Sequence, residues 1–296
     1  EMIKVGYIPE HFSTPLQFAK LKGYFTAEEL DLELIPYPSG SGHLIQSLNS
    51  NEIDIAIGLT EAFVRGIVDT DPGDKPKYQI VGTYVKSPLN WAVSTGISRN
   101  LHSLDELEGG KIGVSRIGSG SYVMSFVLAL QKGFQRQFSD YPVCNTFANL
   151  RQSVNSGDSD AFMWEYFTTK KYYDSKEIKM LGNIYTPWPS WVVVKHRALD
   201  SVQLDKFANA VNRGIKYFGD HPEESIEYIY KNLDYSKEDA TEWLKTVEFH
   251  DNIATIHDKE AVLKKTLNVL QTAKVLKHTD SSTINTNLAN GVYGDL

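Results

Sequence analysis

The chain has 296 residues, of which 23% are charged and 41% hydrophobic, and its formal net charge is -7. These values are ordinary for a globular protein of two domains, and the negative charge argues against binding to the nucleic-acid backbone or to an anionic membrane surface. No apolar run approaches the roughly 18 residues that span a bilayer, so we expect no membrane insertion.

The first part of the chain alternates strand-like and helical runs. Spacing and composition predict strands at 3–8, 30–37, 53–57 and 79–85, with helices at 15–22, 42–50 and 61–68. The pattern then restarts, with strands at 111–116, 143–147, 160–164, 180–185 and 191–195 and helices at 119–132, 150–155 and 165–173. Strand–helix–strand repetition of this kind predicts an α/β fold with mainly parallel sheets.

The last third of the chain is predicted to be helical, at 201–219, 222–232, 236–247 and 259–276. Residues 279–296 are rich in Ser, Thr, Asn and Gly, and we expect this tail to lie over the surface or to be partly disordered.

A short internal sequence similarity, which we call the internal echo, suggests that the two halves of the chain contain a related unit. Residues 49–54 (Asn-Ser-Asn-Glu-Ile-Asp) resemble residues 155–160 (Asn-Ser-Gly-Asp-Ser-Asp) at a constant offset. In both, a predicted helix ends in a turn and an acidic residue opens a strand. Duplication of the unit is the favoured interpretation, and chance similarity in a turn is the alternative.

Candidate site residues lie in polar loops, because ligands of open parallel sheets bind beyond the carboxyl ends of the strands. Five such loops follow predicted strands, and aromatic residues crowd the middle third of the chain. The candidates are His11, Phe12, Ser13, Thr14, Ser39, Gly40, Ser41, Thr60, Glu61, Asn90, Trp91, Ser119, Gly120, Ser121, Trp164, Glu165 and Trp188.

Two kinds of loop carry different chemistry. The Gly/Ser loops at 39–42 and 118–121 precede helices, where free N–H groups favour an anion or a carbonyl; helix capping by the serines is the alternative. Glu61 and Glu165 open helices and are interpreted either as caps or as partners of a ligand amine. Trp164 beside Glu165 favours a cationic or amino-bearing ring.

Catalytic and metal signatures are absent from the sequence. The single cysteine, Cys144, excludes an internal disulfide and a thiolate-based zinc or iron–sulfur site, and we interpret it as a buried residue of an apolar strand. The eight histidines show no metal-binding spacing, and there is no GxSxG nucleophile motif. We therefore expect no metal, no cofactor and no enzyme activity.

The beginning of the chain predicts a location. No charged-then-apolar leader precedes the first strand, so we interpret Glu1 as a cloning remnant, Met2 as the native start and the protein as cytoplasmic. A periplasmic or secreted protein whose leader was removed is the alternative.

Several motifs resemble a known family. Residues 7–9 (YIP), 19–25 (AKLKGYF), 54–58 (DIAIG) and 104–114 (LDELEGGKIGV) are similar to motifs of sulfonate-, nitrate- and thiamine-pyrimidine-type solute-binding proteins. Residues 160–167 (DAFMWEYF) and 185–191 (YTPWPSW) resemble a subgroup that includes a cytosolic Candida-type fungal protein. The resemblance covers most of residues 2–275.

The resemblance implies a type-II periplasmic-binding-protein fold, with two lobes, a central cleft and a hinge. Lobe one would comprise residues 1–88 and 193–296, and lobe two residues 89–192. It also implies binding of a small polar or anionic molecule, such as a thiamine-precursor pyrimidine or a sulfonate-like compound; use of a transporter partner stays open. The alternatives are an enzyme related to fungal thiamine pyrimidine synthase, whose histidine- and cysteine-rich motifs are missing here, and a regulatory protein that kept the fold.

Overall fold

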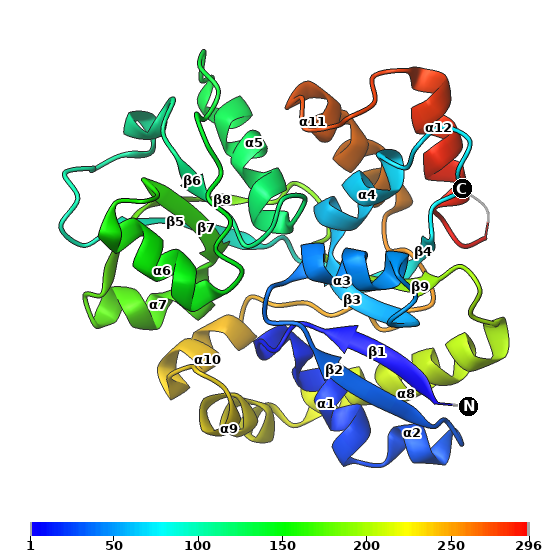
Figure 1. Cartoon of the computed structure of the whole chain (residues 1–296). Coiled ribbons are helices and arrows are strands. Elements are labelled where there is room, and N and C mark those ends of the chain that lie inside the picture. The colour runs from blue at the N-terminus through cyan, green and yellow to red at the C-terminus, as the bar shows by residue number, and fades with distance from the viewer. Residues whose placement is uncertain (1, 295–296) are drawn as a thin grey trace.

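Two mixed β-sheets organise the protein, whose computed structural model describes residues 2–294 (Figure 1). The first sheet has the order β2-β1-β3-β9-β4 and the second the order β6-β7-β5-β8. The first comprises β1 (Ile3–Tyr7), β2 (Leu32–Pro36), β3 (Ile55–Leu59), β4 (Tyr78–Val85) and β9 (Trp191–His196). The second comprises β5 (Asn90–Gly96), β6 (Ile112–Gly113), β7 (Ala161–Glu165) and β8 (Ile178–Tyr185).

Helices surround each sheet and form two lobes (Figure 1). The first lobe carries α1 (Thr14–Leu21), α2 (Tyr24–Ala27), α3 (Ser41–Asn49), α4 (Thr60–Val68), α8 (Ser201–Asp220), α9 (Pro222–Asn232), α10 (Lys237–Leu244), α11 (Thr266–Thr272) and α12 (Ser281–Asn290). The second carries α5 (Gly120–Lys132), α6 (Phe147–Ser156) and α7 (Tyr166–Asp174). Short 3-10 turns occupy His11–Ser13 and Leu104–Leu107, and a π-helical segment, Glu260–Lys265, leads into α11.

Both sheets contain parallel and antiparallel pairs. In each sheet, the antiparallel strand is the one that directly follows a connection from the other lobe. β1 pairs in parallel with β2 and β3, and β6 pairs in parallel with β7, as the strand–helix repeats predict. β9 is antiparallel to β3 and β4, and β5 is antiparallel to β7 and β8. The parallel share is therefore smaller than expected, since β5 and β9 enter their sheets from the other lobe.

Two adjacent segments connect the sheets. Residues 86–89 join β4 to β5, and residues 186–190 join β8 to β9. Backbone and side chain hold these segments together: Thr186 N donates to Leu89 O (3.0 Å), and Leu89 N donates to Thr186 Oγ1 (2.9 Å). Two short connections of this kind are what a hinge requires. The expected boundary at 88/89 falls in the first segment, whereas the expected boundary at 192/193 falls inside β9, just after the second; the division of the chain stays a proposal.

The internal echo has a structural counterpart. Asn51 and Gly157, at equivalent places in the two turns, both have positive φ angles, of 62° and 86°. Asp54 Oδ2 accepts from Lys4 N (2.9 Å), and Asp160 Oδ2 accepts from Lys111 N (2.7 Å). The same aspartate therefore ties two neighbouring strands in each lobe, which supports a repeated unit.

Some predicted strands differ from the structure. β5 was not predicted, because it follows the connection directly and its pairing on both sides is a tertiary feature. Residues 143–147 form no strand: Val143 makes one isolated bridge with Val114, and α6 begins at Phe147. Asn145 has a φ of 69°, which interrupts an extended chain. Cys144 is accordingly only partly buried and lies outside a strand.

The tail is more ordered than predicted. Residues Ser281–Asn290 form α12, which Asp280 caps by accepting from Thr283 N (3.0 Å). Ile284 and Leu288 are buried, and Asn287 Nδ2 donates to the carbonyl of Val68 at the end of α4 (2.9 Å). The last two residues of the chain, which belong to the predicted tail, lie outside the described residues.

Candidate functional site

A small cavity lies between the two lobes, at the carboxyl ends of β1, β3 and β7. Its volume is about 30 Å³, enough for one or two water molecules, so the lobes are nearly closed on each other. Fourteen residues from both lobes line it: Ile8, Glu10, Gly40, Ser41, Leu59, Leu89, Trp91, Ser115, Ser119, Gly120, Ser121, Trp164, Glu165 and Trp191.

Glu10 is the most perturbed carboxyl group of this cleft. It follows β1 in the first lobe, is 9% exposed, and accepts a hydrogen bond from Trp164 Nε1 of the second lobe (3.1 Å). Burial, followed by the nearby Glu165 carboxylate, raises the pKa of Glu10 to about 8. At neutral pH Glu10 is therefore mostly protonated while the cleft is closed.

Glu165 ends β7 and also caps α7. Its Oε1 accepts from Thr168 N (2.8 Å) and Thr168 Oγ1 (3.0 Å), so the capping interpretation is correct for this oxygen. The same oxygen lies 3.1 Å from His11 Nε2 of the first lobe. A role in ligand binding stays a prediction for Glu165, which lines the cavity.

A buried polar network closes the lobes behind this carboxyl pair. Tyr235, in the segment between α9 and α10, shares hydrogen bonds with His11 Nδ1 (3.0 Å) and with Thr168 Oγ1 (2.8 Å). Burial raises the pKa of Tyr235 far above its usual range, so it stays protonated. The Trp164–Glu10, Glu165–His11 and Thr168–Tyr235 pairs each join the two lobes, and we call these three pairs the interlobe latch.

Glu61 links the cleft to a hinge segment. It lies in the first turn of α4, is fully buried, and accepts from Trp188 Nε1 through Oε2 (2.9 Å). Its other oxygen, Oε1, has no hydrogen-bond partner. Burial raises the pKa of Glu61 to about 7. Opposite it, a Cβ added to Gly120 would lie 3.3 Å from Oε1 and 2.3 Å from Leu59 Cδ1, so the close approach of the lobes requires glycine here.

Hydrogen-bond donors face the same cleft. Ser119 caps α5 by accepting from Tyr122 N (3.3 Å), and the N–H groups of Gly120 and Ser121 lie in the first helical turn, where they have no intrahelical acceptor. The indole Nε1 atoms of Trp91 and Trp191 are buried without a hydrogen-bond partner. These groups are available to the acceptor atoms of a ligand.

The predicted residues divide into two groups. Eight of them line the cavity, namely Gly40, Ser41, Trp91, Ser119, Gly120, Ser121, Trp164 and Glu165. The other nine do not line it, namely His11, Phe12, Ser13, Thr14, Ser39, Thr60, Glu61, Asn90 and Trp188. The hydroxyl groups of Ser13, Thr14 and Thr60 instead donate hydrogen bonds to backbone carbonyls.

Six lining residues were not predicted: Ile8, Glu10, Leu59, Leu89, Ser115 and Trp191. The signal for Glu10 was present in the sequence, since it is the first acidic residue after β1 and stands in the first predicted loop. Trp191 opens β9, and only the sheet order brings it beside β3.

The charge of the cleft is unusual for an anion site. Its lining includes two carboxyl groups and three indole rings, and none of the fourteen residues is lysine, arginine or histidine. Among residues 2–294, no cluster of three or more His, Cys, Asp or Glu side chains is arranged to hold a metal ion. None of the helices described over this range is long and apolar enough to span a bilayer.

Comparison with known proteins identifies the family. A family model described as Ca3427-like PBP matches residues 91–184. The solved structure of the Candida albicans CA3427 gene product is 50% identical, with coverage of 100% of this chain and 97% of that chain and a TM-score of 0.92. No curated protein matches the sequence.

More distant structures share the fold alone. The alkanesulfonate-binding protein SsuA from Xanthomonas axonopodis pv. citri, bound to MOPS, is 14% identical, with 94% of each chain covered and a TM-score of 0.74. The nitrate-binding protein NrtA from Synechocystis is 14% identical, with coverage of 97% of this chain and 84% of that chain and a TM-score of 0.71. From its identity to the Candida protein over the whole chain, this protein belongs to the CA3427 family, which has the periplasmic-binding-protein fold.

Proposed function

We propose that the protein binds a small, flat, amino-bearing heteroaromatic molecule between its lobes, and that a thiamine-precursor aminopyrimidine is the best-matched class. The observation that carries the proposal is the composition of the cleft: Glu10 and Glu165 among three tryptophans, with no cationic lining residue. Carboxyl groups that lose water on closure need hydrogen-bond donors, and an exocyclic amine or amidine supplies them.

Hydrogen-bond donors in the same cleft support acceptor atoms on the same ligand. Trp91 Nε1 and Trp191 Nε1 are buried without partners, and Gly120 and Ser121 present free N–H groups. The ring nitrogens of a pyrimidine are acceptors that can receive hydrogen bonds from these N–H groups. Indole rings in the lining favour a planar aromatic ligand, since aromatic rings stack on one another. One ligand with both amine donors and ring acceptors would therefore satisfy both the carboxyl groups and the N–H groups of the cleft.

A sulfonate or nitrate ligand is the second candidate, favoured by the free N–H groups of the Gly118–Ser121 loop and by the ligands named for SsuA and NrtA. A fixed anion would lie beside two acidic side chains, of which Glu10 is mostly protonated in the closed cleft, and no lysine or arginine in the lining would offset its charge. This charge balance favours the amino-bearing ring.

Ligand entry requires the lobes to separate, because the closed cavity has room for only one or two water molecules. The segments at 86–89 and 186–190 would act as the hinge, and the lobes would close on the ligand in a wider arrangement than the latched one, whose cavity is too small for a pyrimidine ring. A cytoplasmic location and a link to thiamine metabolism are parts of this proposal.

Native mass spectrometry of the purified protein and calorimetric titration test the proposal. The titration compares the hydroxymethyl aminopyrimidine moiety of thiamine with an alkanesulfonate and with nitrate. We expect binding of the pyrimidine, and a loss of about 10- to 100-fold in Glu165→Gln, which keeps an oxygen to cap α7 but removes the charge. Binding of the sulfonate or nitrate without any pyrimidine binding would refute the proposal.

A further inference from the structure

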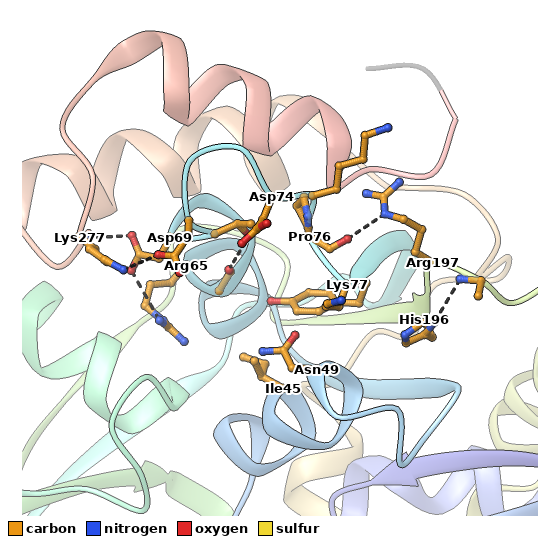
Figure 2. Close-up of a pocket in the computed structure, with 16 residues that line it drawn as sticks. Ile45, Asn49, Arg65, Asp69, Asp74, Pro76, Lys77, His196, Arg197 and Lys277 are labelled. Atoms are coloured by element: carbon orange, nitrogen blue, oxygen red, sulfur yellow. Dashed lines mark hydrogen bonds and ion pairs between the residues drawn. The ribbon is translucent and has the colours of Figure 1, made fainter.

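A second, larger hollow lies in the first lobe and shares no lining residue with the cleft. Its volume is about 720 Å³, within the range of small-molecule sites. α3 contributes Ile45 and Asn49, and α4 contributes Arg65. The other walls come from the 69–78 segment, the residues at the end of β9 and Lys277. Figure 2 shows Lys77 between the Arg65–Lys277 end and the His196–Arg197 end.

The hollow concentrates positive charge in an acidic protein. Five cationic side chains line it, Arg65, Lys75, Lys77, Arg197 and Lys277, against three carboxylates, Asp69, Asp71 and Asp74. The whole chain, by contrast, has a net charge of -7. Convergence of cations from four separate segments on one concave surface produces a local positive potential that favours anions.

Two of the three carboxylates, Asp69 and Asp71, interact with Lys277. Lys277 Nζ contacts Asp71 Oδ1 at 2.7 Å, and Lys277 N donates to Asp69 Oδ1 at 2.8 Å. Lys75 and Lys77 are exposed, and within the described part of the chain neither side chain has a hydrogen bond or ion pair. The 75–77 end of the hollow therefore carries two ammonium groups against one carboxylate, Asp74, which is a net excess of one positive charge.

His196 supplies an independent sign of a missing partner. Its Nδ1 accepts from Ala198 N (3.1 Å), which places the proton of the neutral ring on Nε2. That Nε2 is buried and has no hydrogen-bond partner. Burial lowers the pKa of His196, the nearby Asp54 carboxylate opposes this shift, and the charges of Lys195, Lys77 and Arg197 add to it. A buried donor without an acceptor, next to free cations, is what an anion would complete.

The available donors favour a phosphate over a carboxylate. The guanidinium group of Arg197 already donates to backbone carbonyls: Nε donates to Pro76 O (2.8 Å) and Nη2 donates to Asn290 O. Arg65 Nη1 lies 3.5 Å from Asp69 Oδ2. The cations without a partner among the described residues are therefore the compact ammonium groups of Lys75 and Lys77, which bind the several oxygens of a phosphate as point charges. We propose that this hollow is a binding site for a small phosphate-bearing metabolite, separate from the interlobe cleft.

Calorimetric titration with inorganic pyrophosphate, at low ionic strength, tests the site. We expect binding to the wild-type protein and about tenfold weaker binding to Lys77→Ala, the effect of one lost charge-assisted hydrogen bond. Lys75→Ala/Lys77→Ala should lose more. Lys20→Ala, an exposed lysine of α1, is the matched control and should bind as the wild type does. Citrate in place of pyrophosphate should bind more weakly.

A second measurement does not depend on the variants. In NMR titrations of the imidazole resonances, pyrophosphate should raise the pKa of His196, because a nearby anion favours the protonated ring. Glu10→Gln should leave pyrophosphate binding unchanged, since Glu10 lines only the cleft. No binding to the wild type, equal binding to Lys75→Ala/Lys77→Ala, or tighter binding of citrate would overturn the proposal.

Discussion

The protonation of Glu10 makes the stability of the closed protein depend on pH. Its pKa is raised from 4.5 to about 8, so the folded, closed protein holds a proton that the unfolded chain releases between these values. The free energy of unfolding is therefore highest below about pH 4.5, as far as Glu10 is concerned, and falls as the pH rises toward 8. The difference corresponds to on the order of 5 kcal/mol.

That value is an upper limit, because opening of the cleft returns Glu10 to water and ends the penalty. Glu10→Gln removes the titration and keeps an acceptor for Trp164 Nε1. Compared with the wild type, we expect this variant to have a similar free energy of unfolding near pH 5, and to be more stable by a few kcal/mol near pH 9.

Urea denaturation at both pH values measures the effect. Glu33→Gln, at an exposed position of β2, is the control and should differ from the wild type equally at the two pH values. Small-angle scattering of the wild type should also show expansion as the pH rises, if ionised Glu10 opens the cleft. A difference between Glu10→Gln and wild type that does not change with pH would refute the reasoning.

Three further substitutions test the closure and the packing. Tyr235→Phe removes the hydroxyl that joins His11 to Thr168, and scattering should show a more open protein while urea denaturation shows a loss of about 1–2 kcal/mol. Gly120→Ala should hold the lobes apart and weaken ligand binding, because its Cβ would meet Leu59. Gly219→Ala, with open space around the added Cβ, is the control. An unchanged scattering profile of Gly120→Ala would contradict this expectation. Gly82→Ala should cost about 3 kcal/mol or more, because its Cβ would lie 1.7 Å from the carbonyl oxygen of Ile253, and an unchanged melting temperature would contradict the packing shown.

Several features of the candidate site could be predicted from local sequence patterns. The strand ends at Tyr7, Leu59 and Glu165 were predictable, because apolar runs of strand length are followed there by polar, helix-opening residues. Glu165, at the end of β7, lines the cleft, as do Ser119 and Gly120, which follow β6 at the start of α5. The capping function of Ser119 and Glu165 was equally local, since a cap contacts a residue only three positions along the chain.

Other features were beyond local reasoning. The burial of Glu10 and the resulting pKa depend on Trp164 and Glu165, which are more than 150 residues away in the sequence. Similarly, the uncompensated charge of the second hollow depends on Lys277 approaching Asp69 and Asp71. Sequence alone shows that these residues exist, and it cannot show which charges neutralise one another.

The sequence by itself therefore determined the α/β class, the polar loops and, through its motifs, the family, because each follows from short-range periodicity or from contiguous residues. The tertiary structure decided the pairing of β5 and β9, the packing of α12 and the interlobe latch. It also decided which carboxyl groups lose their water, since desolvation depends on the three-dimensional neighbours of a group and not on its neighbours along the chain.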